Sequence, residues 1–246
     1  MISAGPADGP RLLVVQHEAG TGAGWWEGWL TAAGVELLVR HPYAGDDLPG
    51  PTAYDGVLVL GGAMGPADDD ACPWLPATRA LVADAVAGEV PLFGICLGAE
   101  LLAVACGGTV RRGAEPELGV LGIEMSVGAA EDPVLSCLPA QPRVLQWHWE
   151  EMVELPAGAV RLASSTAYPH QAFRLGDTAW GVQGHPEVTP AIARTWARDD
   201  APLLTAAGRG AEDLVREVEE ASDELARTWR PVAEAFAAVV VAKSGR

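Results

Sequence analysis

The apolar positions of the first hundred residues fall into short continuous runs separated by segments with helical spacing. Continuous runs of strand length occupy 11–17, 35–39, 56–60 and 90–95. Helical spacing covers 24–34, 78–87 and 97–106. Strands that are apolar throughout and alternate with helices are typical of a parallel sheet covered on both faces. The pattern therefore predicts an α/β fold.

The pattern changes after Gly107. Short β-like pieces separated by Gly, Pro and acidic turns fill 109–149, which predicts an added antiparallel β section. Further strands are expected at 161–164, 171–175 and 180–183, and a helix begins at 190–196. The stretch 212–241 predicts a long amphipathic helix with a kink or break at Pro231. Packing on the sheet is the simplest role for this helix, and binding a partner is the alternative.

The chain of 246 residues fits one large domain, since no internal repeat and no long linker interrupts it. Residues 1–10 are rich in Gly and Pro and are expected to be disordered. Residues 11–200 form the predicted main domain. Residues 201–246 form a helical extension that we expect to pack on the same domain.

Charge and cysteine content limit the classes of partner and cofactor that we expect for this chain. With 33 acidic and 16 basic side chains, the net charge of −17 disfavours nucleic acid and anionic membranes as partners, and solubility is its simplest explanation. The four cysteines show no metal or disulfide spacing, so neither a metal nor a cofactor is predicted. No signal segment and no apolar run of about 18 residues is present, so a cytoplasmic location is expected.

The stretch PLFGICLGAELL places Cys96 between Gly94 and Gly98, where a strand must turn into a helix. A lone cysteine in an apolar segment is usually a small buried hydrophobe. At such a turn, however, glycines relieve crowding and the side chain is lifted out of the sheet. The N-terminus of the following helix is then expected to favour the thiolate. Cys96 is therefore a candidate nucleophile.

A nucleophilic thiol needs a base and an orienting group, and His185 and Glu187 follow another apolar strand. Parallel strands end at the same edge of a sheet, so His185 can meet Cys96. The loop at Gly61 and Gly62 ends a third strand and can supply an oxyanion N–H opposite that of Leu97. The alternative for the loop is a plain turn, and a phosphate cradle is disfavoured because no Lys follows.

These pieces resemble a class I (triad-type) glutamine amidotransferase, of the stand-alone kind termed GMP synthase-like. The motifs that carry the resemblance, in family order, are VLGGAMG, PLFGICLGAELLA, CGGTV, QWHWEEM and WGVQGHPEVT. The resemblance implies a flavodoxin-like or Rossmann-like three-layer sandwich. It also implies Cys96 as nucleophile, His185 as base and then acid, Glu187 as orienter, and oxyanion donors at Gly62 and Leu97.

The resemblance also implies substrate-binding positions at Gly61, Glu100, Trp149 and Glu150. Two positions depart from the family pattern, because Glu100 stands where a glutamine is usual and Gly184 where a large aromatic residue is usual. A carboxylate at position 100 would add a negative charge beside the thiol and favour a positively charged group. The alternative is that Glu100 faces solvent or pairs with Arg111 or Arg112.

The function implied is hydrolysis of glutamine to glutamate and ammonia through a cysteinyl γ-glutamyl thioester. No synthetase region follows in this sequence, so we expect the ammonia to pass to a separate acceptor subunit. Two alternatives remain open. One is a self-sufficient hydrolase of γ-glutamyl amides or peptides, and the other is a non-catalytic binding or regulatory protein with the same fold.

Overall fold

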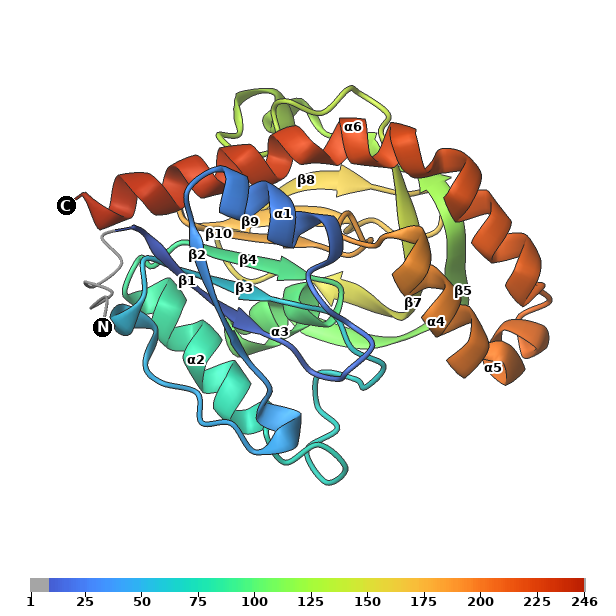
Figure 1. Cartoon of the computed structure of the whole chain (residues 1–246), viewed down its shortest axis with the longest axis horizontal. Helices are drawn as coiled ribbons and strands as arrows, with labels where there is room; N and C mark the ends of the chain where they lie inside the picture. Colours follow the sequence, from blue (N-terminus) through green and yellow to red (C-terminus); the bar gives the residue numbers. More distant parts are fainter. Residues whose placement is uncertain (1–8, 246) are drawn as a thin grey trace, which may run out of the picture.

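The structure is a computed structural model that describes residues 9–245, so the predicted disordered segment 1–10 lies almost entirely outside the described residues. Eight strands form one sheet in the order β2-β1-β3-β4-β10-β9-β8-β6, and two more form a separate ribbon (Figure 1). The strands of the main sheet are β1 (Arg11–Val15), β2 (Glu36–Arg40), β3 (Gly56–Val59), β4 (Leu92–Ile95), β6 (Glu124–Met125), β8 (Val160–Ser164), β9 (Ala172–Leu175) and β10 (Ala179–Val182).

The sheet is parallel in one half and antiparallel in the other. Strands β2, β1, β3, β4 and β10 pair in parallel, whereas β9, β8 and β6 pair antiparallel. The helices that surround the strands are α1 (Gly24–Ala32), α2 (Leu75–Ala87), α3 (Leu97–Ala105), α4 (Pro190–Asp199), α5 (Ala201–Ala206) and α6 (Ala211–Ser244), with short 3-10 turns η1 (Pro42–Ala44), η2 (Pro51–Ala53) and η3 (Val127–Glu131). The predicted α/β sandwich with an added antiparallel section is confirmed.

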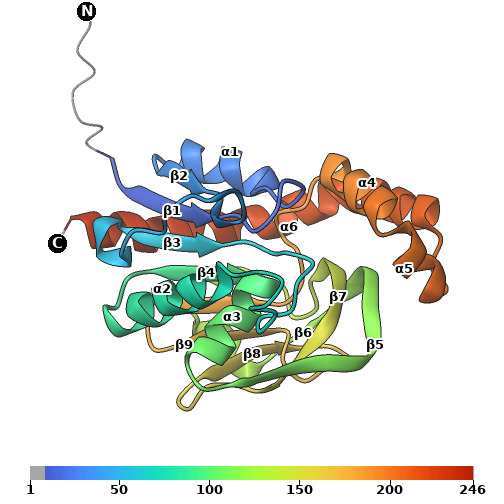
Figure 2. The ribbon, with the colours of Figure 1, turned by 90° about the horizontal axis from the view of Figure 1, so that it is seen from below.

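Alternate residues of the central strands bury on opposite faces of the sheet. Leu12 and Val14 of β1 join the core beneath α1 and α6, and Leu13 and Val15 join the core beneath α2 and α3. Figure 2 shows these two helix pairs on either side of the strands. Because both faces are covered, the central strands are apolar along nearly their whole length, and each fully buried aliphatic side chain contributes about 1.5–3 kcal/mol.

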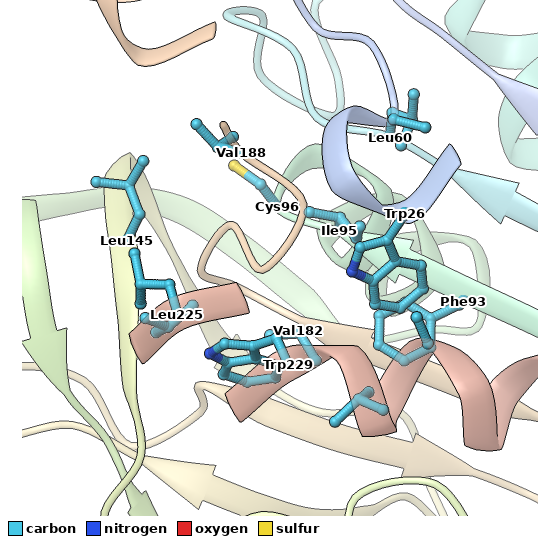
Figure 3. Close-up of a cluster of buried hydrophobic side chains, with 14 of the residues drawn as sticks. Trp26, Leu60, Phe93, Ile95, Cys96, Leu145, Val182, Val188, Leu225 and Trp229 are labelled. Carbon is cyan, nitrogen blue, oxygen red and sulfur yellow. The ribbon is translucent and has the colours of Figure 1, made fainter. Parts of the chain in front are cut away.

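Aromatic side chains bind the long helix α6 to the sheet. The rings of Trp26 and Phe93 lie 4.6 Å apart, and Phe236 of α6 lies 5.4 Å from Phe93. Trp229 is fully buried and donates from Nε1 to the carbonyl of Arg143 at 2.8 Å. Figure 3 shows Cys96 at the margin of this cluster, so the candidate nucleophile stands on a rigid core.

Of the kink or break predicted at Pro231, the break is wrong, because α6 continues through this residue to Ser244. A proline inside a helix removes one hydrogen bond and crowds the preceding turn. Here Trp229, Val232 and Phe236 on the flanking turns are fully buried, and their packing outweighs the local cost of the proline.

Among residues 9–245, no helix combines the length and apolarity needed to cross a membrane.

Most of the short β-like pieces predicted between 109 and 149 belong to two long strands, β5 (Thr109–Gly122) and β7 (Arg143–Glu154), and residues 124–125 form β6. The polar half of β5 was missed because it stands away from the core and most of its residues are exposed or half-buried. Ladder hydrogen bonds to β7 hold it, helped by cross-strand ion pairs such as Arg111 with Glu151 at 2.6 Å. This ribbon forms one wall of the candidate site described next.

Candidate active site

The candidate site lies where the parallel strands end. Strand β4 ends at Ile95, directly opposite Val182 at the end of β10, and the Cys96 N–H donates to the Val182 carbonyl at 2.8 Å. Strand β3, on the other side of β4, leads into Gly61 and Gly62. The strand order therefore brings three separate sequence motifs to one edge, as the carboxyl ends of parallel strands require.

Cys96 occupies a sharp turn between β4 and α3. Its φ of 50° and ψ of −110° lie outside the regions that non-glycine residues usually adopt, and such strain costs on the order of 1–3 kcal/mol. Close approach explains the flanking glycines, since a Cβ on Gly98 would overlap the Val59 carbonyl oxygen and one on Gly94 would lie 2.5 Å from the Gly98 backbone. The turn has the form of a nucleophile elbow.

His185 is held from several sides. Its Nδ1 lies 2.9 Å from Oε1 of Glu187, its backbone N–H donates to Leu145 of β7 at 2.7 Å, and Trp196 packs edge-on at 4.7 Å. Both His185 and Glu187 are almost fully buried. The carboxylate therefore fixes the ring orientation and leaves Nε2 for the proton transfer.

Gly61 connects the histidine to the cysteine. A Cβ placed on Gly61 would lie 2.9 Å from Cε1 of His185 and 3.5 Å from Cβ of Cys96. Both side chains thus lie against the same bare stretch of backbone, although 89 positions separate them in the sequence. The bare backbone at Gly61 gives the pair the room to meet.

Burial and nearby carboxylates keep the Cys96 thiol protonated. Burial raises the pKa of Cys96 well above its usual value, and the charges of Glu100, Glu187 and Glu150 raise it further. The Leu97 N–H at the start of α3 lowers the pKa, as expected for a helix N-terminus, but burial and the carboxylates outweigh it. A base must therefore remove the proton as the sulfur attacks.

Glu100 is buried beside the thiol, with only 2% of its surface exposed. Its Oε1 accepts a hydrogen bond of 2.8 Å from Nε2 of Gln183, which also lies 3.9 Å from Sγ of Cys96. Arg111 and Arg112 instead lie 2.6 and 3.6 Å from Glu151 and Glu150. The alternatives of a solvent-facing or arginine-paired Glu100 are therefore wrong.

The ionisation of Glu100 follows from this burial. Burial raises its pKa from 4.5 to about 8, the charge of Glu150 raises it too, and the hydrogen bond from Gln183 partly offsets the rise. At pH 7 this carboxyl group is therefore mostly in its neutral form. The permanent negative charge expected from the sequence is thus wrong near neutral pH.

A cavity of about 400 Å³ opens in front of Cys96. Of the nine predicted site residues, six line it: Gly62, Cys96, Glu100, Trp149, Glu150 and His185. Glu187 lies behind His185, and Gly61 lies against both His185 and Cys96. Leu97 contributes its N–H next to the sulfur while its side chain is buried in the core.

Gly184, where the family usually has an aromatic residue, does not line this cavity. A Cβ there would lie 2.8 Å from Val144 and 3.1 Å from the carbonyl oxygen of Leu145. The position thus faces β7 and the core, where Val144 fills the space. Packing of Val144 beside Gly184 thus takes the place of the aromatic side chain that is usual at this position.

Several functional candidates were missed in the sequence. The cavity is also lined by Glu18, Arg112, Trp147, His148, Trp196, Asp199 and Asp200. Gln183 could have been found, since it directly follows the strand that pairs with β4. Glu18 and Asp200 could not, because nothing in the local pattern shows that the β1–α1 loop and the end of α4 face each other.

The buried polar network behind β7 explains how its side chains are aimed. His148 lies 3.0 Å from Oε2 of Glu117 and 2.7 Å from the backbone oxygen of Glu150. Gln171 also donates to Glu117, at 2.5 Å. These bonds fix the strand that carries Trp149 and Glu150.

Among residues 9–245, no group of three His, Cys, Asp or Glu side chains is arranged to hold a metal ion.

The fold and this site define an α/β domain with a buried cysteine, histidine and glutamate at the carboxyl edge of its parallel strands. The family model for glutamine amidotransferase class-I matches residues 31–198. The chain therefore belongs to the class-I glutamine amidotransferase family.

Individual relatives agree with this assignment. The glutamine amidotransferase-like protein YfeJ of Salmonella typhimurium is 31% identical over 73% of this chain and 76% of its own length. One subunit of the glutamine-hydrolysing GMP synthase of Saccharolobus solfataricus is 42% identical over 41% of this chain, and the match spans about half (52%) of that relative. A glutamine amidotransferase structure from Thermotoga maritima has a TM-score of 0.83 at 27% identity, covering 93% of this chain and 98% of its own.

Proposed function

We propose that the chain hydrolyses glutamine to glutamate and ammonia through a thioester on Cys96. His185 takes the thiol proton as Sγ attacks the side-chain carbonyl carbon, and the N–H groups of Gly62 and Leu97 stabilise the oxyanion. The C–N bond then breaks, and His185 returns the proton to the departing nitrogen. Water attacks the thioester with His185 as base, which releases glutamate and restores the thiol.

The observation that carries this proposal is that Cys96 and His185 both lie against Gly61, with Glu187 bonded to the histidine at 2.9 Å. Passage of the ammonia to a separate acceptor subunit is part of the proposal. Its support is the likeness to one of the subunits of GMP synthase, a glutamine-hydrolysing enzyme. The acceptor would dock at the cavity mouth, where the leaving nitrogen emerges.

The test is glutamate release by the isolated chain incubated with glutamine. We expect turnover by the wild type, a loss of several orders of magnitude in Cys96→Ala, and near-normal rates in Cys137→Ala, whose thiol is exposed. Substantial turnover by Cys96→Ala would exclude the thioester. Absence of turnover by the wild type, without labelling of Cys96 by a glutamine-like electrophile, would support the non-catalytic alternative.

A second candidate is a hydrolase of γ-glutamyl amides that needs no partner. The observation that favours it is the acidic lining of the cavity, which glutamine does not require. Glutamate release from γ-glutamyl alkylamides, measured beside glutamine in the same assay, separates the two. Faster release from the alkylamides favours the hydrolase, and faster release from glutamine favours the amidotransferase.

A further inference from the structure

The side of the cavity that receives the leaving group can be located from His185, which protonates that group in the proposed mechanism. The ring of Trp196 packs against His185 at 4.7 Å, and Trp196 belongs to α4. That helix ends at Asp199 and is followed by Asp200, and both residues line the cavity with Trp196. A group that leaves past His185 therefore meets the end of α4.

Three carboxylates gather on this side of the cavity. Glu18, from the loop after β1, lines it together with Asp199 and Asp200. Burial raises the pKa of Glu18, and the charges of Asp200 and Asp199 raise it further, while the hydrogen bond from the Ala63 N–H lowers it. Asp199 and Asp200 thus act electrostatically on Glu18, and a cation among the three carboxylates would relieve this repulsion.

Nearby basic side chains neutralise little of the negative charge of these three carboxylates. Arg198 pairs with Asp199 at 2.8 Å, but both side chains are mostly exposed. Arg112, which also lines the cavity, lies 3.6 Å from Glu150 on the ribbon of β5 and β7. In the part of the chain that the structure describes, no ion pair involves Glu18 or Asp200.

Two indole rings stand beside these carboxylates. Trp147 and Trp196 meet edge-on with ring centroids 5.7 Å apart, and both line the cavity. Trp147 donates from Nε1 to Asp200 at 2.9 Å, and Trp196 donates to the Gly20 carbonyl at 2.9 Å, which fixes both rings. Fixed indole rings next to unpaired carboxylates form a suitable environment for an alkylammonium group.

We propose that this side of the cavity binds a protonated amine on the leaving group, so that the preferred substrates are γ-glutamyl amides of alkyl diamines. The proposal rests on the thioester chemistry proposed above, adopts its second candidate, the hydrolase of γ-glutamyl amides, and names the substrate class. Hydrolysis breaks the amide C–N bond, adds the water oxygen to the glutamyl carbonyl, and transfers a proton to the departing nitrogen. The products are glutamate and the free diamine, whereas glutamine would leave Glu18 and Asp200 without a cation.

The experiment compares two γ-glutamyl amides of equal size. One carries diaminobutane, and the other carries n-pentylamine, in which a methyl group replaces the ammonium group. We expect kcat/KM for glutamate release to be about tenfold higher for the diaminobutane amide, as one charge-assisted contact provides. The preference should shrink as salt is added, because this side of the cavity is partly open to solvent.

Variants test which residues cause the preference for the diaminobutane amide. Glu18→Gln and Asp200→Asn each keep the size and the hydrogen-bond acceptor, and each should lower the ratio of the two kcat/KM values several-fold. Asp223→Asn, on the exposed side of α6, is the matched control and should keep the wild-type ratio. Because each variant is compared with itself on two substrates, a general loss of folded protein leaves the ratio unchanged.

The outcomes separate this proposal from the one on which it rests. Equal kcat/KM values for the two amides in the wild type, with both turned over, would overturn the amine site and leave the thioester chemistry intact. If neither amide nor glutamine is turned over, calorimetric binding of both amides to Cys96→Ala decides. Tighter binding of the diaminobutane amide would support the amine site, and equal binding would reject it.

Discussion

Gln183 donates one hydrogen bond of 2.8 Å to Glu100, and the same nitrogen lies 3.9 Å from the sulfur of Cys96. One amide thus links the buried carboxyl group to the candidate nucleophile. Since the pKa of Glu100 is raised to about 8, this carboxyl group changes its charge just above neutral pH. Its ionisation therefore acts on the thiol in alkaline solution, whereas near pH 7 the neutral acid can donate a hydrogen bond as an amide would.

The first prediction concerns the reactivity of Cys96 in Glu100→Gln. Above pH 8 the wild-type carboxylate disfavours the thiolate, so the variant should reach half-maximal alkylation by iodoacetamide about one pH unit lower. Glu151→Gln, on β7 and outside the cavity lining, is the control and should follow the wild type. Mass spectrometry of the Cys96 peptide measures the rate, and superimposable profiles for Glu100→Gln and wild type would contradict the coupling.

The same carboxyl group should make stability depend on pH. In the unfolded chain Glu100 loses its proton near pH 4.5, and in the folded protein near pH 8. Between these values the unfolded state has released a proton that the folded state keeps, so the free energy of unfolding falls as pH rises. Glu100→Gln should therefore gain stability relative to the wild type from pH 5 to pH 8, on the order of a few kcal/mol. Urea unfolding at both pH values measures the gain, and an unchanged difference would show that Glu100 ionises normally.

The roles of His185 and Glu187 predict an order of damage. His185→Asn removes both proton transfers and should lower kcat/KM for glutamate release by roughly three orders of magnitude or more. Glu187→Gln can still accept the Nδ1 proton at the present 2.9 Å, but it no longer stabilises the imidazolium, so a loss of roughly 10- to 100-fold is expected. Steady-state kinetics would disprove the orienting role if the two variants were equally damaged.

The central strands could be predicted from the sequence because burial on both faces makes β3, β4 and all of β1 after Arg11 continuously apolar. The turn at Cys96 could be predicted because Gly94 and Gly98 mark the close contact of strand and helix. Both features are local, so a short stretch of sequence contains all the information they require.

What could not be predicted depends on contacts between distant segments. The polar half of β5 is a strand only because β7 lies beside it. The protonation of Glu100 depends on its burial, and the approach of Glu18 to Asp200 depends on where the β1–α1 loop and the end of α4 lie in the fold. None of these is a property of neighbouring residues in the chain.

The last prediction concerns Pro231, which lies inside α6 where a break was expected. Replacing it with alanine restores an N–H that can donate to the Arg227 carbonyl and removes the clash with the preceding turn. Alanine also makes the unfolded chain more flexible, and the larger entropy of the unfolded state offsets part of this stabilisation. Pro231→Ala should therefore raise the free energy of unfolding by about 1–2 kcal/mol. Pro190→Ala is the matched control, because proline suits the first turn of α4, where no N–H partner is lost, and it should have no stabilising effect. Urea unfolding of both variants, with equal dependence on denaturant, decides the question. A destabilised Pro231→Ala would mean that the buried flanks Trp229 and Val232 hold α6 in a shape that only proline fits.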